Sequence, residues 1–382
     1  MRIAIATFWD TPVNYGQVLQ GYALEKALQD MGHESFIIRY TMKEEVLNDS
    51  IRMKIMRVLR GERTLSQLFR RFTSRGQYTS ERGFMAFKER NMRYSTRIYD
   101  SFDDIAADIP QADIYVTGSD QVWGAWGSDN KKRVFLLDFL PGNARRMSYG
   151  TSFGRSSLTS MEEPYFRRCL SRYSAISVRE QQGKDICRGL GLDANVVVDP
   201  TFLLDSEAWT RHLDLNGLNS KHEKKAYVFI YSVTNDESNK RLYQYIDYFK
   251  KTGHDVIYVS STNYLDKKAT FEPTIEEWLW HIKNASLVLT NSFHGVAFSL
   301  NFNTPFIAQT KGTKTSGEDT RLLSLLNTTK TGNRLMAEFD RTKVETVTGR
   351  NIEWGYVNSI LGQERTDSQS FLNRSISNCL KY

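Results

Sequence analysis

The stretch Leu287–Ser299 reads LVLTNSFHGVAFS and contains an apolar run, a polar loop and the start of a helix. The run Leu287–Thr290 has the length and character of a strand that is buried on both faces. Strands of this kind that alternate with helices build parallel sheets. The stretch therefore predicts an α/β fold in which its polar residues lie at the carboxyl end of a strand.

The same alternation extends over both halves of the chain. Strands are predicted in the first half at 2–7, 35–40, 113–117, 146–149, 175–178 and 195–198, and in the second at 226–231, 255–259, 286–290 and 305–308. Helices are predicted over 18–28 and 162–172, after Arg179, and near 237–251 and 274–283. This order predicts two tandem Rossmann-like, doubly wound α/β domains that face a central cleft.

The boundary between the two domains is predicted just after Asp199-Pro200, where the strand pattern stops and a polar stretch follows. We expect an N-terminal domain over 1–204, with a basic helical insertion at about 42–100. We expect a C-terminal domain over 205–350, followed by a tail over 351–382.

Composition excludes several classes of protein. The 382 residues are 40% apolar and 25% charged, as in ordinary globular chains, and no apolar run reaches the ~20 residues that span a bilayer. The first apolar run, 3–9, is too short for a secretory signal. Three cysteines without a C-x-x-C spacing favour neither a disulfide scaffold nor a zinc site. We expect a soluble, cytoplasmic protein.

The net charge of +7 is concentrated in one segment. Residues 51–97 hold 13 Lys and Arg against three Glu, so the remainder of the chain is slightly acidic. A basic amphipathic helix is predicted at the start of this segment, and it has two interpretations. It either lies on an anionic membrane surface or packs on its own domain with its charges in solvent. No nucleic-acid-binding motif accompanies it, so we expect no nucleic-acid partner.

Five polar clusters directly follow predicted strands, where open α/β sheets bind ligands. They are Asn14–Gln17, Gly118–Asp120, Gly150–Ser152, Arg179 and Asn291–Gly295. None is a G-x-G-x-x-G, so a dinucleotide site is disfavoured.

Arg179 has little structural reason for its position, whereas His294 is either an ordinary structural histidine or a ligand contact. Arg179 at a helix start opposes the helix dipole, and an anion held by Arg179 and the helix amides would remove that conflict. His294 lies beside Ser292 and Gly295, whose amides can bind an oxyanion. Both residues are predicted to contact a ligand.

The other clusters keep two interpretations each. Asn14 and Gly16 form either a turn with a helix N-cap or, with Gln17, a ligand contact. Asp120 is either an N-cap or a carboxylate that orients or deprotonates a hydroxyl. Thr151 and Ser152 either satisfy turn hydrogen bonds or contact a ligand.

Taken together, these strand-end residues resemble the polysaccharide pyruvyl transferase family. The resemblance extends over about residues 1–310. It is carried, together with Trp209, by NYGQVLQ at 14–20, ADIYVTGSDQVW at 112–123, SYGTSFG at 148–154, ISVRE at 176–180, VDPTFLL at 198–204 and LVLTNSFHGVAFS at 287–299.

The resemblance implies a GT-B-like fold and transfer of a pyruvyl group from phosphoenolpyruvate to a sugar diol. A cyclic ketal forms and phosphate leaves, with no metal or nicotinamide cofactor. It implies that Arg179 and His294 hold the donor. We also expect Ser292, Gly295 and Lys311 beside the donor, with the first domain on the acceptor side and the second on the donor side. Asn14, Gly16, Gln17, Thr151 and Ser152 are expected on the acceptor side. For catalysis we expect His294 as acid or phosphate clamp and Asp120 as base or orienting group. The tail, with its apolar stretch 356–361, is expected to form a helix that crosses back to the first domain.

One departure from the family pattern concerns the donor. Several members carry Arg-Leu-His where this chain has Ser292-Phe293-His294, so an arginine is missing at Ser292. Lys311, Lys314 or Arg321 are candidates to supply that charge.

Three functions are therefore compared. The main hypothesis is a pyruvyl transferase for a capsule or exopolysaccharide precursor linked to polyprenyl diphosphate, held at the inner membrane face through 51–97. The second is a GT-B glycosyltransferase that binds a nucleotide sugar through Glu318 or Asp319. The third is a non-catalytic protein that binds an anionic sugar. The sequence leaves the acceptor sugar and the oligomeric state open.

Overall fold

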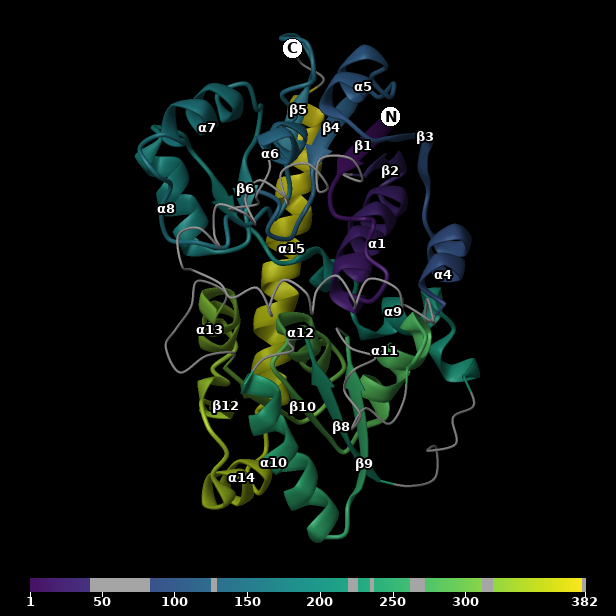
Figure 1. Ribbon diagram of the computed structural model, residues 1–382, viewed down its shortest axis with the longest axis vertical. Helices are drawn as coiled ribbons and strands as arrows, with labels where there is room; N and C mark the ends of the chain where they lie inside the picture. Colours follow the sequence, from purple (N-terminus) through teal and green to yellow (C-terminus); the bar gives the residue numbers. More distant parts are fainter. Residues whose placement is uncertain are drawn as a thin grey trace, which may run out of the picture.

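The computed structural model describes residues 1–41, 83–124, 129–218, 226–233, 237–261, 272–310 and 319–379 (Figure 1). Two five-stranded parallel sheets, each with helices around it, form its upper and lower halves in Figure 1. The prediction of two Rossmann-like α/β units is confirmed. Strands of the first sheet all lie before residue 205, and those of the second lie between 227 and 336.

The first sheet has the order β3-β2-β1-β4-β5. Its strands are β1 (Arg2–Ala6), β2 (Glu34–Tyr40), β3 (Tyr94–Tyr99), β4 (Ile114–Thr117) and β5 (Arg146–Ser148). Its helices are α1 (Tyr15–Asp30), α4 (Phe84–Asn91), α5 (Phe102–Ala107), α6 (Asp129–Phe135), α7 (Glu163–Leu170) and α8 (Gln181–Gly189). The short strands β6 (Ser177–Val178) and β7 (Asn195–Val196) pair with each other and adjoin the β5 edge through single bridges. The strand order reverses between β1 and β4, where such folds bind ligands.

The second sheet has the order β12-β11-β10-β8-β9. Its strands are β8 (Tyr227–Ser232), β9 (Asp255–Ser260), β10 (Leu287–Thr290), β11 (Phe306–Gln309) and β12 (Leu335–Met336). Helices α9 (Ser206–His212), α10 (Glu237–Lys251), α11 (Ile275–Asn284), α12 (Phe293–Asn301), α13 (Asp319–Thr328) and α14 (Arg341–Thr348) accompany it, with 3₁₀ turns η2 (Pro200–Phe202), η3 (Leu215–Gly217) and η4 (Gly332–Arg334). This order reverses between β8 and β10.

One part of the predicted domain plan was wrong. The range 42–100 was expected to be a helical insertion, but β3 within it is an edge strand of the first sheet. Its burial pattern alternates irregularly, with Ser95 and Tyr99 buried and Ile98 half exposed, so it lacks the apolar run that marks the central strands. Residues 42–82 lie outside the described residues.

Helix α1 lies between the two halves and is buried on most sides. Asn14 caps its first turn by accepting a hydrogen bond from the amide of Gln17 (3.2 Å). Tyr15 stacks on Trp278 of α11 with ring centroids 5.0 Å apart, and its hydroxyl donates to the carbonyl of Pro273 (2.6 Å). Because Tyr15 follows β1 of the first sheet and Trp278 precedes β10 of the second, one continuous hydrophobic core joins the halves.

A long C-terminal helix, α15 (Trp354–Asn378), runs from the second half along the first (Figure 1). Arg365 donates to the carbonyl of Phe202 (2.6 Å), and Ser368 accepts from the amide of Val198 (3.0 Å). Near its end, Cys379 lies 2.9 Å from the Ser174 hydroxyl. The helix therefore fastens the chain end to the strand ends of the first half.

The described part of the basic segment is packed against the fold. Phe84 and Phe87 of α4 are fully buried, and Lys88 donates to the carbonyl of Thr11 (2.8 Å). Arg90 pairs with Glu276, and Arg97 pairs with Asp104 and Asp108. For these residues, packing against the fold describes what is seen, and Arg90 pairs with Glu276 of the second half. Residues 51–82, which carry most of the charge, lie outside the description.

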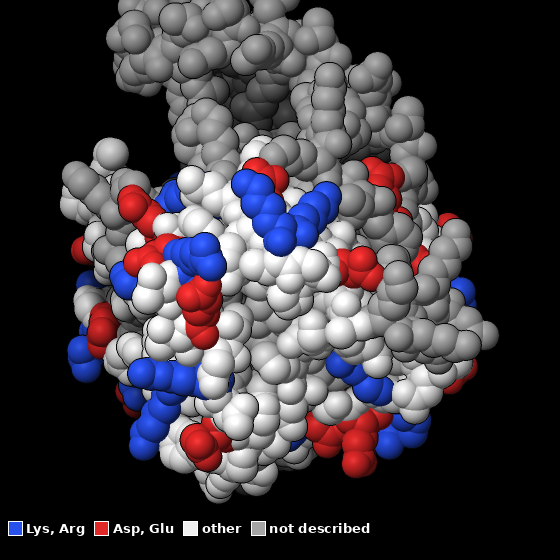
Figure 2. All heavy atoms as spheres, turned by 90° about the horizontal axis from the view of Figure 1, so that it is seen from below, with Lys and Arg blue, Asp and Glu red and all other residues white. Residues whose placement is uncertain are grey.

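Charges of both signs are mixed on the face seen from below in Figure 2, where blue and red side chains alternate over the described part. No helix among the described residues is long and apolar enough to cross a membrane.

Candidate functional site

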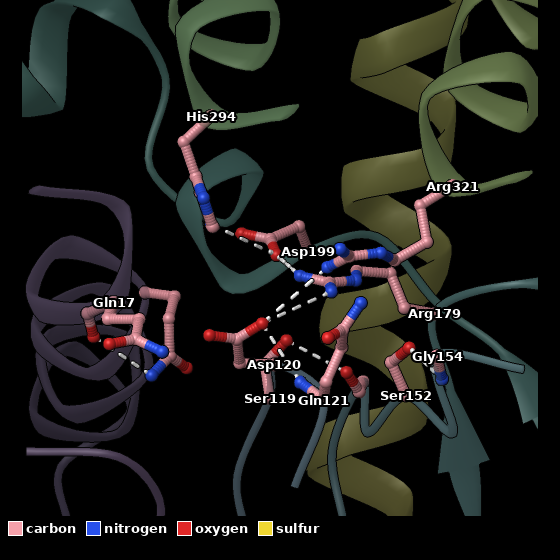
Figure 3. A network of polar contacts seen from close by, with 12 residues as sticks. Gln17, Ser119, Asp120, Gln121, Ser152, Gly154, Arg179, Asp199, His294 and Arg321 are labelled. Carbon is pink, nitrogen blue, oxygen red and sulfur yellow. Dashed lines mark hydrogen bonds and ion pairs between the residues drawn. The ribbon is translucent and has the colours of Figure 1, made fainter. Parts of the chain in front are cut away.

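A cluster of ionic side chains lies where the two reversal points of strand order meet (Figure 3). Asp120 follows β4 of the first sheet, and His294 is on the first turn of α12, directly after β10 of the second. Arg179 precedes α8, Asp199 precedes η2 and Arg321 comes from α13. The fold thus brings together side chains from five separate segments.

Asp199 is the most deeply placed member of the cluster. Its side chain is fully buried, and one oxygen pairs with Arg179 and lies 3.6 Å from His294 Nε2. The other oxygen accepts from the amide (3.0 Å) and the hydroxyl (2.7 Å) of Thr201. Burial alone would raise the pKa of Asp199, but the charges of Arg179 and His294 and these hydrogen bonds hold it well below the usual range. Asp199 is therefore ionised and fixed.

Asp120 is shared by two arginines. Its Oδ1 lies 3.6 Å from Arg179 Nη2 and 3.5 Å from Arg321 Nη1. Burial opposes the charge of Asp120, but Arg179, Arg321 and His294 together lower its pKa. A carboxylate so stabilised has a low affinity for protons and is a weak general base. The predicted N-cap role is not seen, because Asp120 has a φ of 75° and begins no helix.

Arg321 was one of three residues predicted to supply a missing positive charge, and the structure brings its guanidinium into the cluster. Both guanidinium groups lie over the ring of Phe293, with Cζ of Arg179 4.9 Å and Cζ of Arg321 5.8 Å from the ring centroid. Such cation–π contacts are attractive, because the face of an aromatic ring carries partial negative charge. Phe293 was not singled out from the sequence as a functional residue, and no local signal identifies it.

Three buried nitrogen atoms at the centre of the cluster, Nε and Nη2 of Arg179 and Nε2 of His294, make no close hydrogen bond among the described residues. Nη2 of Arg179 and Nε2 of His294 each have only a longer contact of 3.6 Å, with Asp120 and Asp199 respectively. Leaving a buried donor unpaired costs about 1–3 kcal/mol, and more for a charged group. An anion that entered beside them would satisfy these donors.

His294 fits its place because Gly16 faces it. A Cβ on Gly16 would lie 2.1 Å from His294 Nδ1, so any side chain at position 16 would collide with the imidazole. Ser292 caps α12, accepting from the amide of Gly295 (3.3 Å), and Gly295 itself packs against Thr290. The structure thus brings α1 of the first half into direct contact with α12 of the second.

Thr151 and Ser152 lie beneath the cluster and are fully buried. The Thr151 hydroxyl donates to the carbonyl of Ser177 (3.0 Å), and that of Ser152 donates to Glu180 (2.7 Å). Both hydroxyls are therefore engaged within the protein in this structure. By contrast, Gln17 is half-buried and lies across from Asp120 and His294 in Figure 3.

A model of the polysaccharide pyruvyl transferase family matches residues 14–308. The chain belongs to this family. The match extends from the N-cap of α1 to β11 and includes Asp120, Arg179, Asp199 and His294. No curated protein matches the sequence significantly.

Two solved structures with the same fold align with nearly the whole of this chain. A UDP-GlcNAc 2-epimerase from Methanocaldococcus jannaschii in complex with UDP-GlcNAc and UDP is 14% identical, with a TM-score of 0.55, and covers 99% of this chain and 100% of its own. The N-terminal domain of a Candida albicans trehalose-6-phosphate phosphatase is 12% identical, with a TM-score of 0.51 and coverage of 100% and 96%. At this identity they show the GT-B-type fold alone.

Sequence reasoning about this family member missed Asp199 as a site residue. Asp199 directly follows a predicted strand and lies inside the matching stretch 198–204, so the signal was present. Of the predicted donor residues, Lys311 lies outside the described residues, as do Lys314 and Glu318. Among the described residues, no group of three His, Cys, Asp or Glu side chains is arranged to hold a metal ion.

Proposed function

We propose that this protein transfers a pyruvyl group from phosphoenolpyruvate to two hydroxyls of a sugar in a capsule or exopolysaccharide precursor. The observation that carries the proposal is the set of buried nitrogen atoms on Arg179 and His294 that make no close hydrogen bond among the described residues, in a chain of the pyruvyl transferase family. Phosphoenolpyruvate carries a phosphate and a carboxylate, both of which accept charge-assisted hydrogen bonds from such donors.

The two arginines of the cluster are held by protein carboxylates, and the cluster still has donor groups for an anionic substrate. Arg179 and Arg321 are neutralised in the structure by Asp120 and Asp199, which hold the guanidinium groups in place. The conflict between Arg179 and the start of α8 is therefore relieved by protein carboxylates. Nε of Arg179 has no hydrogen bond among the described residues, and Nη2 has only the 3.6 Å contact with Asp120. Preorganised donors of this kind stabilise charge without rearrangement during the reaction.

We infer the following order of steps for the reaction. His294 donates a proton to the methylene carbon of the enol, and the carbon that carries the phosphate becomes an oxocarbenium-like centre. One acceptor hydroxyl attacks this carbon and gives its proton to the imidazole of His294, which the first step left neutral. The carbon–oxygen bond to phosphate then breaks, and the second hydroxyl closes the ketal ring as its proton leaves with the phosphate. Asp120 holds Arg179 and Arg321 in place through its ion pairs during these steps.

We further propose that the acceptor is a polyprenyl-diphosphate-linked sugar at an anionic membrane surface. Since Lys88, Arg90 and Arg97 are engaged within the fold, this part of the proposal depends on residues 51–82. Reversing the charges of that segment should abolish co-sedimentation with anionic vesicles. Unchanged sedimentation would contradict it.

Thermal stabilisation by phosphoenolpyruvate tests the donor site. A ligand at ~100 times its Kd stabilises a protein by about 2.7 kcal/mol, which gives a clear rise in Tm. We expect this rise for the wild type and its loss in Arg179→Ala and His294→Ala. Arg188→Ala, an exposed arginine of the neighbouring helix α8, is the matched control. A rise with UDP-sugars and none with phosphoenolpyruvate would instead support a glycosyltransferase.

A further inference from the structure

A separate cavity of about 240 Å³ opens at the carboxyl ends of β1 and β2, beside the ionic cluster. Its walls include the aromatic side chains of Phe8, Trp9 and Phe135. Asp10, Gln17 and Lys131 supply polar groups to the same space. Neither Arg179 nor His294 lines it, so it is distinct from the proposed donor site.

The aromatic walls are held in fixed positions. The Trp9 indole donates to the carbonyl of Tyr40 (2.9 Å), and its ring packs beside Tyr94 (5.7 Å). Phe8 meets Phe135 edge to face, with ring centroids 5.2 Å apart. A ligand that stacks on these rings therefore meets a surface that is already formed, which reduces the entropic cost of binding.

The loop that carries Phe8 and Trp9 is itself anchored at both ends. The Thr7 hydroxyl donates to the carbonyl of Ser119 (3.0 Å), which ties the loop to the segment after β4. Lys88 donates to the carbonyl of Thr11 (2.8 Å), and the Thr11 hydroxyl accepts from the amide of Asn14 (3.1 Å). The loop that forms this wall of the cavity is therefore held in place by hydrogen bonds at both of its ends.

Size and charge limit what the cavity can hold. Its volume lies below the ~300–1,000 Å³ of pockets for drug-sized ligands, so a nucleoside diphosphate is too large. One acid, Asp10, and one base, Lys131, offset each other, and Lys131 lies over the Phe8 ring at 4.8 Å. Aromatic faces with a few polar groups at their edge suit a neutral pyranose, which has apolar C–H faces and hydroxyls around its rim.

Two residues of the cavity wall, Gln17 and Lys131, lie close to the ionic cluster. Gln17 lines the cavity and also lies across from Asp120 and His294 (Figure 3). Burial lowers the pKa of Lys131, and the negative charge of Asp120 acts against this, so the lysine lies within electrostatic reach of the cluster. A ring in the cavity would direct its hydroxyls past Gln17 toward the bound donor.

We propose that this cavity binds one neutral hexopyranose ring of the acceptor, stacked on the aromatic wall that includes Trp9, with its hydroxyl pair toward Gln17. That the bound sugar is the acceptor rests on the proposed function. That the cavity binds a sugar does not depend on it.

Saturation-transfer NMR tests the sugar site directly. The probes are the methyl pyranosides of glucose, galactose, mannose, N-acetylglucosamine and N-acetylmannosamine, each added to the full-length wild-type protein. We expect transfer to at least one of them, with Kd raised about tenfold in Trp9→Ala by loss of stacking and partly restored in Trp9→Phe. Tyr356→Ala, whose ring stacks with Lys330 elsewhere, should bind as wild type does.

The outcomes separate this proposal from the proposed function. Transfer to none of the probes, or transfer unchanged in both Trp9→Ala and Gln17→Ala, would overturn the sugar site. Retained stabilisation of Trp9→Ala by phosphoenolpyruvate would show that the variant is folded. A protein that binds a pyranoside but is not stabilised by phosphoenolpyruvate would keep the sugar site and overturn the proposed donor.

Discussion

Among single residues, Asp199 determines the geometry of the ionic cluster. It contacts Arg179, Thr201 and His294, which come from three different segments. Removing the charge of a buried carboxylate leaves its partners without a counter-charge, which costs free energy. The stability of the fold is therefore sensitive to loss of the Asp199 charge. The same residue fixes the orientation of both proposed donor-binding side chains.

Replacing Asp199 by Asn should lower the free energy of unfolding at pH 7 by about 3–5 kcal/mol, because Arg179 loses its closest counter-charge. The wild type has a lowered pKa at this carboxyl, so its contribution is present above the ordinary pKa and disappears as the pH falls toward the lowered one. The destabilisation caused by Asp199→Asn should therefore shrink in acid. Urea unfolding at several pH values measures this, and the exposed Asp193→Asn is the control. A loss independent of pH would contradict the account.

Gly16 is the second residue whose identity is imposed by a contact. In Gly16→Ala the new methyl group would lie 2.1 Å from His294 Nδ1, so the imidazole must move. We expect this variant to lose at least tenfold in affinity for phosphoenolpyruvate, about 1.4 kcal/mol. Isothermal titration calorimetry gives the Kd.

Gly362→Ala provides the comparison, since a Cβ at that position of α15 meets no atom within 4 Å. It should bind phosphoenolpyruvate as the wild type does and be more stable by roughly 0.5–1 kcal/mol, the helix propensity of alanine over glycine. Equal binding by the two variants would show that Gly16 does not position His294.

Among the secondary-structure elements, the contact of α1 with the start of β3 contains a buried acid. Glu25 of α1 is 1% exposed; one carboxyl oxygen accepts from the amide of Arg93 (2.8 Å) and from Gln29 (3.0 Å). Its other oxygen has no hydrogen-bond partner among the described residues. Burial raises the pKa of Glu25 to about 8, although these hydrogen bonds act against the shift.

This contact should make the fold less stable as the pH rises. A raised pKa means that the folded protein keeps a proton which the unfolded chain releases above about 4.5, so stability is complete below that pH and falls up to about 8. The slope is about 1.4 kcal/mol per pH unit for one proton. Glu25→Gln should remove this slope between pH 5 and 8 in urea unfolding, whereas the exposed Glu338→Gln should retain it. A slope that persists in Glu25→Gln would exclude Glu25 as its source.

In the whole molecule, the two α/β halves share one hydrophobic core. Tyr15 on Trp278 and Tyr22 beside Trp209 (5.6 Å) carry it across the junction, and α15 fastens the chain end to the first half. Groups from both halves therefore form the ionic cluster across this shared core.

We expect the two halves to unfold together in one calorimetric transition, because neither can expose its share of this core alone without losing packing in the other. Phosphoenolpyruvate should move that single transition as a whole. Two resolved transitions, only one of them shifted by the ligand, would show that the halves are energetically separate.

The sequence by itself determined the α/β class, the central strands and helices, and the family. These follow from local signals: apolar runs of strand length, helical spacing, and polar residues at strand ends such as Asn14 and His294. It also indicated Arg179 as an anion-binding residue, a role that stays a prediction. Short edge strands such as β3 and β12 carry too little apolar pattern to be recognised.

Only the tertiary structure decided which charges face one another. Asp120 and Arg321 are about two hundred positions apart in the chain, and no local pattern links them; folding places them 3.5 Å apart. The same holds for Gly16 and His294, and for Thr151, whose hydroxyl proved to be engaged within the fold. The physical reason is that helical and strand periodicity is set by neighbours along the chain, whereas pairing, burial and pKa depend on distances that exist only after the sheets have assembled.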